Sequence, residues 1–189
     1  TMVDSDGLIK WAPHNLFLNS EDVTAWDLSA NLVESNGAED PDGGTKGISL
    51  VENTNTGNHQ VGYSSALDAI VDETKTHTFE IYVKRLSGTR NLQIQNQSTS
   101  NSEQWTFDLT AVTATRTFGS AFGYTGSIED VGNGWFKCVM AKGSAASGTF
   151  RAYIRVASGT SDTYTGDGVS GLAIAFPRIY RSDLGGMAP

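Results

Sequence analysis

The sequence predicts an all-β protein, an antiparallel jelly-roll β-sandwich with short extended termini. Three observations predict this class. Apolar and polar residues alternate along many short segments, as they do in strands that bury one face. Clusters of turn-forming residues separate these segments. Charged residues make up only 18% of the 189 residues, which is low for a helical bundle rich in Glu and Lys.

The alternation is clearest in residues 77–84, where Phe79, Ile81 and Val83 share one side. Residues 91–95, 104–109 and 150–156 repeat the pattern. These segments predict a core that contains Phe79, Ile81, Val83, Leu92, Ile94, Phe150, Ala152, Ile154 and Val156. We expect further strands over 26–32, 46–51, 60–63, 111–118, 134–141 and 171–180.

Residues that tolerate positive φ lie between the predicted strands. They occur at 41–44, 56–58, 87–89, 132–134 and 166–168. The helical signal is weak and predicts single turns only, over residues 20–23 and 66–71.

We expect three parts along the chain: a lead-in arm over 1–14, the sandwich over 15–181 and a tail over 182–189. Apolar side chains in the lead-in are costly to leave in water, so we expect this arm to dock on a neighbouring subunit. The docking residues of this hypothesis are Leu8, Ile9 and Trp11.

The 13 basic and 21 acidic residues give a formal net charge of −8. This balance disfavours nucleic acid and anionic membranes as partners, since both require clustered Lys and Arg. The single cysteine, Cys138, excludes an intrachain disulfide and lies in a hydrophobic run, which predicts a buried side chain. The first residues carry no basic segment followed by an apolar one, so we expect no secretory signal.

The sequence contains no nucleophile elbow, no zinc-ligand spacing and no phosphate-binding glycine pattern. We therefore expect a protein that is not an enzyme and has no cofactor. The acids on predicted strands, Glu80, Asp108 and Glu129, are expected to be solvated. Calcium is a minority alternative, because loops supply carboxylates at Asp40, Asp42, Asp162 and Asp167.

The polar pleat of the predicted strands gives the most specific functional hypothesis. It combines aromatic rings, amides and guanidinium groups, which together stack on and hydrogen-bond sugars. The candidate carbohydrate-binding residues are Tyr82, Lys84, Gln93, Gln95, Arg151, Tyr153 and Arg155. The same pleat is equally compatible with packing against another subunit, and both interpretations stay open.

Several stretches together resemble a domain common in structural proteins of tailed phages. The similar motifs are Trp11–Phe17 followed by Asn19–Asp22, Thr78–Lys84, Val131–Cys138 and Tyr164–Leu172. The resemblance covers the chain from about Asp4 to Tyr180. It implies a jelly roll similar to carbohydrate-binding modules and concanavalin-like lectins.

In phages, such domains occur on tail fibres, on head spikes and as capsid decoration. The resemblance therefore implies a non-enzymatic virion protein, made in the host cytoplasm, that contacts other virion proteins. Virion symmetry favours a homo-oligomer, a dimer or a trimer. The alternative function is a carbohydrate-binding module that recognises a host or environmental polysaccharide.

Overall fold

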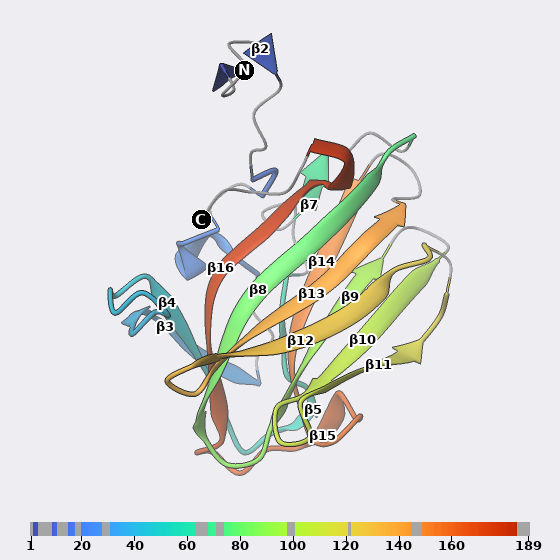
Figure 1. Ribbon diagram of the computed structural model, residues 1–189. Coiled ribbons are helices and arrows are strands. Elements are labelled where there is room, and N and C mark those ends of the chain that lie inside the picture. The colour runs from blue at the N-terminus through green and yellow to red at the C-terminus, as the bar shows by residue number, and fades with distance from the viewer. Residues whose placement is uncertain are drawn as a thin grey trace.

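The computed structural model describes most of the chain as two antiparallel sheets packed face to face (Figure 1). The described residues are 2–3, 9–10, 15–17, 20–27, 31–62, 68–70, 74–97, 101–120, 122–144 and 149–184. The predicted all-β sandwich is confirmed. Among these residues, no helix combines the length and hydrophobicity needed to cross a membrane.

One sheet, here called the β8–β16 sheet, has six strands. In spatial order they are β12 (Thr125–Gly132), β13 (Trp135–Ser144), β8 (Thr76–Ser87), β16 (Gly171–Arg181), β4 (Gly47–Glu52) and β3 (Leu32–Ala38). The two longest strands, β8 and β16, pair side by side at its centre.

The other sheet, here called the β9–β14 sheet, faces it across the core. Its order is β11 (Thr113–Phe118), β10 (Ser102–Asp108), β9 (Asn91–Gln97) and β14 (Thr149–Ala157), and β14 also pairs with β6 (Gln60–Val61) and β7 (Asp68–Ile70). The chain passes from one sheet to the other several times, as in a jelly roll.

Two small sheets complete the structure. Strands β1 (Met2–Val3) and β2 (Ile9–Lys10) pair with each other, and β5 (Thr56–Asn58) pairs with β15 (Thr163–Thr165). Short 3₁₀ turns occur at η1 (Val23–Ala25) and η4 (Ser182–Leu184).

The core lies between the two sheets and follows the predicted alternation. Buried side chains come from both: Phe79, Ile81 and Val83 from β8, and Leu92 and Ile94 from β9. Of the other predicted core residues, Ala152, Ile154 and Val156 are also fully buried, whereas the side chain of Phe150 lies outside the described part. Each large apolar side chain buried in this way contributes about 1.5–3 kcal/mol.

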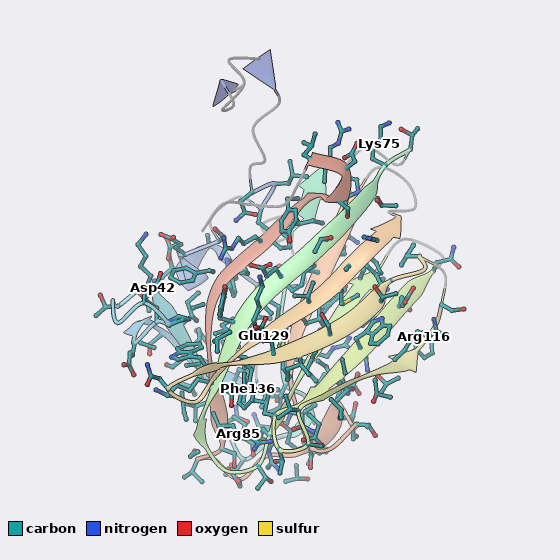
Figure 2. The ribbon with its side chains drawn as sticks, viewed as in Figure 1. Asp42, Lys75, Arg85, Arg116, Glu129 and Phe136 are labelled. Carbon is teal, nitrogen blue, oxygen red and sulfur yellow. The ribbon has the colours of Figure 1, made fainter. Side chains whose placement is uncertain are left out.

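Cys138 is buried in this core, as predicted. Burial raises the pKa of its thiol well above the ordinary value, because the apolar surroundings disfavour the thiolate. Charged side chains such as Asp42, Lys75 and Arg116 lie at the periphery instead (Figure 2).

Three local predictions need correction. Residues 68–70 of the expected turn 66–71 form β7, because they pair with β14 instead of closing a helical turn. The helical turn predicted over 20–23 lies slightly later, at η1. The Asp22 carboxylate accepts a hydrogen bond from Thr24 N in η1 at 3.0 Å. The strand expected to start at Trp26 starts at Leu32; Trp26 lies in a bend and is buried in the core.

Candidate functional site

The structure divides the predicted carbohydrate-binding set between the two outer faces of the sandwich. Tyr82 and Lys84 lie on β8, in one sheet, whereas Gln93 and Gln95 on β9 lie in the other. The residues Arg151, Tyr153 and Arg155 on β14 share the β9–β14 sheet with the two glutamines. Five of the seven residues are thus brought to one sheet, and two are not.

Two cross-strand rows organise the outer face of the β9–β14 sheet. The first row runs through the paired residues Tyr153, Gln95, Gln104 and Phe118. The second contains Arg155, Gln93 and Thr106. Neighbouring strands therefore place aromatic, amide, hydroxyl and guanidinium groups next to one another.

Arg155 is the centre of the hydrogen bonds on this face. Its Nε donates to Gln60 Oε1 at 2.9 Å, and its Nη1 donates to Asp162 Oδ2 at 2.9 Å and to Gln104 Oε1. Its guanidinium carbon also lies 5.4 Å from the centre of the Tyr153 ring. The Arg155 side chain on β14 therefore links this strand to β6, to β10 and to the loop that carries Asp162.

Burial lowers the pKa of the Arg155 guanidinium, and the nearby Asp162 carboxylate and Tyr153 oppose that shift. Arginine starts from a pKa so high that the group stays protonated at neutral pH. The face therefore keeps a fixed, partly desolvated positive charge beside a carboxylate.

Most of these side chains are buried, in contrast to the solvated pleat expected from the sequence. Gln93 is completely buried because the segment after β14 folds over it: Gln93 Nε2 donates to Thr160 O at 2.7 Å and to Thr106 Oγ1 at 2.9 Å. Tyr153 and Arg155 are also buried, while Arg151 is exposed. Alternation shows which side of a strand a residue occupies but gives no sign of a covering loop.

A cleft of about 440 Å³ opens beside this network. Phe118 is 60% exposed at the cleft, at the end of β11. The carbonyl Oε1 of Gln95 is buried and makes no hydrogen bond to any described residue. The lining residues are Gln95, Gln104, Thr117, Phe118, Arg155, Thr160 and Asp162.

Sequence reasoning missed Phe118, Gln104 and Asp162 as members of one site. The signal for Phe118 was its place at the end of a predicted strand, directly before Gly119. Nothing in the sequence indicates that β11 lies two strands from β9, so the cleft could not be assembled from the pattern.

The strand-borne acids do not form one cluster. Glu80 is buried and forms ion pairs with Lys137 at 2.9 Å and Arg178 at 3.4 Å, so the solvated position expected for it is wrong. Asp108, in the other sheet, accepts hydrogen bonds from the backbone of Thr110 and Ala111, which lower its pKa. Glu129 is exposed on β12, as expected.

Three of the four loop aspartates that suggested calcium, Asp40, Asp162 and Asp167, have carboxylates with protein partners. Asp40 accepts backbone hydrogen bonds from Asp42, Gly44 and Lys46 at 2.9–3.0 Å, which closes a tight turn. Asp162 binds Arg155. Within the described ranges, no three His, Cys, Asp or Glu side chains group in a way that could hold a metal ion.

Of the three predicted docking residues, the structure describes only Ile9. Ile9 lies in β2, where it pairs with Val3. Leu8 and Trp11 lie outside the described residues, so the docking hypothesis stays a prediction.

No protein-family model and no curated protein sequence matches the chain. Among solved structures, it is similar to the enzymatically active domain of tailspike protein 4 of bacteriophage CBA120, with a TM-score of 0.50 and 14% identity over 88% of this chain. It also matches the CBM22-1–GH10 modules of Clostridium thermocellum endo-1,4-β-D-xylanase 10B, complexed with xylohexaose, with a TM-score of 0.44 and 12% identity over 94% of the chain.

This chain covers only 21% of the tailspike chain and 29% of the xylanase chain. At 14% identity, the similarity to the tailspike domain is a similarity of fold. The chain is therefore an antiparallel β-sandwich of a kind that also occurs in a phage tailspike.

Proposed function

We propose that this chain is a non-catalytic carbohydrate-binding domain of a virion protein, and that the cleft beside Phe118 holds the saccharide. The single observation that carries the proposal is the combination in one cleft of an exposed aromatic ring with amide, guanidinium and carboxylate groups. A volume of about 440 Å³ falls within the range of pockets that bind small ligands.

The chemistry of the lining fits a sugar ring. The C–H face of a pyranose packs on an aromatic ring, as apolar groups do. Its hydroxyls both donate and accept, so a site needs carbonyl or carboxylate oxygens together with N–H donors. Asp162 supplies a carboxylate acceptor, and Arg155 and Gln104 supply N–H donors. Arg155 donates hydrogen bonds to both Gln104 and Asp162, which holds the three side chains in place.

The virion context is supported by the sequence motifs that resemble those of tailed-phage structural proteins. Capsid decoration, a head spike and a tail fibre are the forms this role takes, with other virion proteins as partners. Mass spectrometry of purified particles tests it: the chain is expected among the virion proteins, and its absence from the particles would refute the virion assignment.

Substitution of Phe118 by Ala tests the saccharide site. Because the ring is exposed, we expect the free energy of unfolding to change by no more than about 0.5 kcal/mol. Binding to the glycans selected on an array is expected to weaken about tenfold, measured by isothermal titration calorimetry.

Val33→Ala is the matched control, because Val33 is equally exposed but lies on β3 in the other sheet. It should leave glycan binding unchanged. An array with no binding at multivalent display, or a Phe118→Ala variant that binds normally, would contradict the proposal.

A further inference from the structure

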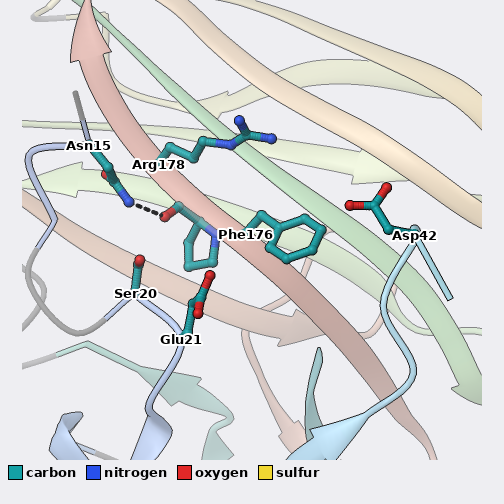
Figure 3. A pocket seen from close by; sticks show the side chains of 7 residues that line it. Asn15, Ser20, Glu21, Asp42, Phe176 and Arg178 are labelled. Atoms are coloured by element: carbon teal, nitrogen blue, oxygen red, sulfur yellow. Dashed lines mark hydrogen bonds between the residues drawn. The ribbon is translucent and has the colours of Figure 1, made fainter. Parts of the chain in front are cut away.

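A second cleft, of about 350 Å³, lies beside β16 of the β8–β16 sheet (Figure 3). It shares no lining residue with the Phe118 cleft. Phe176 and Pro177 of β16 form its apolar part. The other lining residues are Asn15, Ser20, Glu21, Asp42 and Arg178. They come from segments far apart in the sequence, so the cleft exists only in the folded domain.

Phe176 has an unusual backbone for a bulky residue. Its φ is +50°, in the left-handed region that favours glycine, and it lies at an irregularity of β16 between Ala175 and Arg178. Asn15 clamps this irregularity: its Nδ2 donates to Pro177 O and its Oδ1 accepts from Ile179 N, both at 3.0 Å. Strained residues held in this way concentrate at functional sites.

The strain has a visible result, because it places the Phe176 ring at the cleft. The ring lies edge-on to Tyr82, with centroids 6.1 Å apart, and stays partly exposed. In Figure 3 the carboxylate of Asp42 points toward this ring from across the cleft. Among the described residues, that carboxylate takes part in no ion pair and no side-chain hydrogen bond.

Arg178 completes the polar side of the cleft. Its Nη2 lies 3.4 Å from Glu80 Oε1, and its guanidinium stacks over Tyr82 at 5.9 Å. Its Nε has no hydrogen-bond partner among the described residues. Glu80 also pairs with Lys137, and Glu21 pairs with Lys46 at 3.2 Å. Of the two lining carboxylates, only that of Asp42 has no ion-pair partner among the described residues.

We propose that this cleft is a second saccharide site, specific for a neutral pyranoside. The apolar face of the sugar packs on Phe176, its hydroxyls donate to Asp42, and one hydroxyl accepts from the guanidinium of Arg178. A sugar carboxylate is disfavoured, because it would lie beside the carboxylate of Asp42, which has no ion-pair partner among the described residues. The site does not depend on the Phe118 cleft, since it lies on the other sheet.

The test is amide-resolved NMR titration with methyl glycosides of glucose, galactose and mannose at millimolar concentration, with methyl glucuronide as the charged probe. We expect the amides of Asp42, Phe176 and Arg178 to shift with at least one neutral glycoside. The glucuronide should bind there at least tenfold more weakly.

Phe176→Gly is the decisive variant, because glycine tolerates the positive φ while the ring is lost. We expect its melting temperature to be unchanged or higher, with the shifts near Arg178 abolished. Asp42→Asn, at an exposed residue, should fold normally and weaken binding at least threefold.

Each outcome decides the proposal. The absence of shifts at these amides with every neutral glycoside, or shifts that persist in Phe176→Gly, would overturn it. Shifts confined to Gln104, Thr117 and Phe118 would overturn it while supporting the first cleft. Shifts confined to the Phe176 cleft would support it and refute the proposed function of the first cleft.

Discussion

Two ion-paired arginines, the partly buried Arg90 and the buried Arg155, use the same chemistry in different ways. Arg90 donates twice to Glu52, from Nε to Oε2 at 2.8 Å and from Nη2 to Oε1 at 2.5 Å. Glu52 also accepts from Tyr164 OH and from Asp167 N, both at 2.7 Å. This carboxylate is fully buried, and four donors saturate its two oxygens.

Arg155 distributes its hydrogen bonds among three separate acceptors, and the side chain of its carboxylate partner Asp162 is 30% exposed beside a cleft. The pKa shifts have opposite directions: hydrogen bonding to Glu52 raises the pKa of Arg90, whereas burial lowers that of Arg155. A saturated pair holds strands together, while a distributed one leaves polar groups within reach of a ligand.

Of the variants that test this difference, Glu52→Ala is expected to destabilise the protein most. Removal of one partner leaves the charge of Arg90 poorly solvated and deprives Tyr164 and Asp167 of their acceptor, so we expect a loss of about 3–5 kcal/mol in the free energy of unfolding. Chemical denaturation measures it. Glu129→Ala, at an exposed strand glutamate, is the control and should change stability by no more than about 0.5 kcal/mol.

A smaller effect is expected at the second arginine. Asp162→Asn removes the charge of a partly exposed partner but keeps its shape, so stability should fall by about 1 kcal/mol or less. Saccharide binding at the Phe118 cleft is expected to weaken several-fold in the same variant. If Asp162→Asn destabilised the protein as much as Glu52→Ala, the proposed difference between Arg90 and Arg155 would be wrong.

The smallest expected effect is on the stability of the protein at acidic pH. His59 is buried and stacks on Tyr164, with ring centroids 4.2 Å apart, and burial lowers its pKa below the ordinary 6.5. The unfolded chain therefore takes up the proton more readily, so this contribution to stability is complete above about pH 6.5 and declines as the pH falls below it.

His59→Phe keeps the stacking and removes the titration. Thermal melts between about pH 7 and pH 5 should show a shallower loss of stability for this variant than for the original chain. Equal slopes for the two proteins would show that His59 does not contribute to the acid response.

Much of the fold could be predicted because local alternation reports burial directly. Phe79, Ile81 and Val83 face the core as their period of two requires. The partners of each strand could not be predicted, because pairing depends on contacts such as Thr78 with Tyr180, which are remote in sequence. This is why Tyr82 and Gln95, on the same type of pleat, lie on opposite faces.

The candidate sites were predictable only in part, for the same reason. Gln95 and Arg155 were identified from residue type and strand position, and both line the Phe118 cleft. The Phe176 cleft gave no sequence signal, because it needs an irregular strand held by Asn15 from the other end of the chain. Backbone irregularity of this kind appears only in three dimensions.

The central place of the last strand has a consequence for synthesis. Strand β16 separates β8 from β4, so the β8–β16 sheet is two unconnected halves until Gly171–Arg181 is added. A nascent chain that has not yet released this segment from the ribosome carries two unpaired strand edges. The sheet is therefore completed only after Gly171–Arg181 has been translated, and a chain that stops before Gly171 is expected to aggregate.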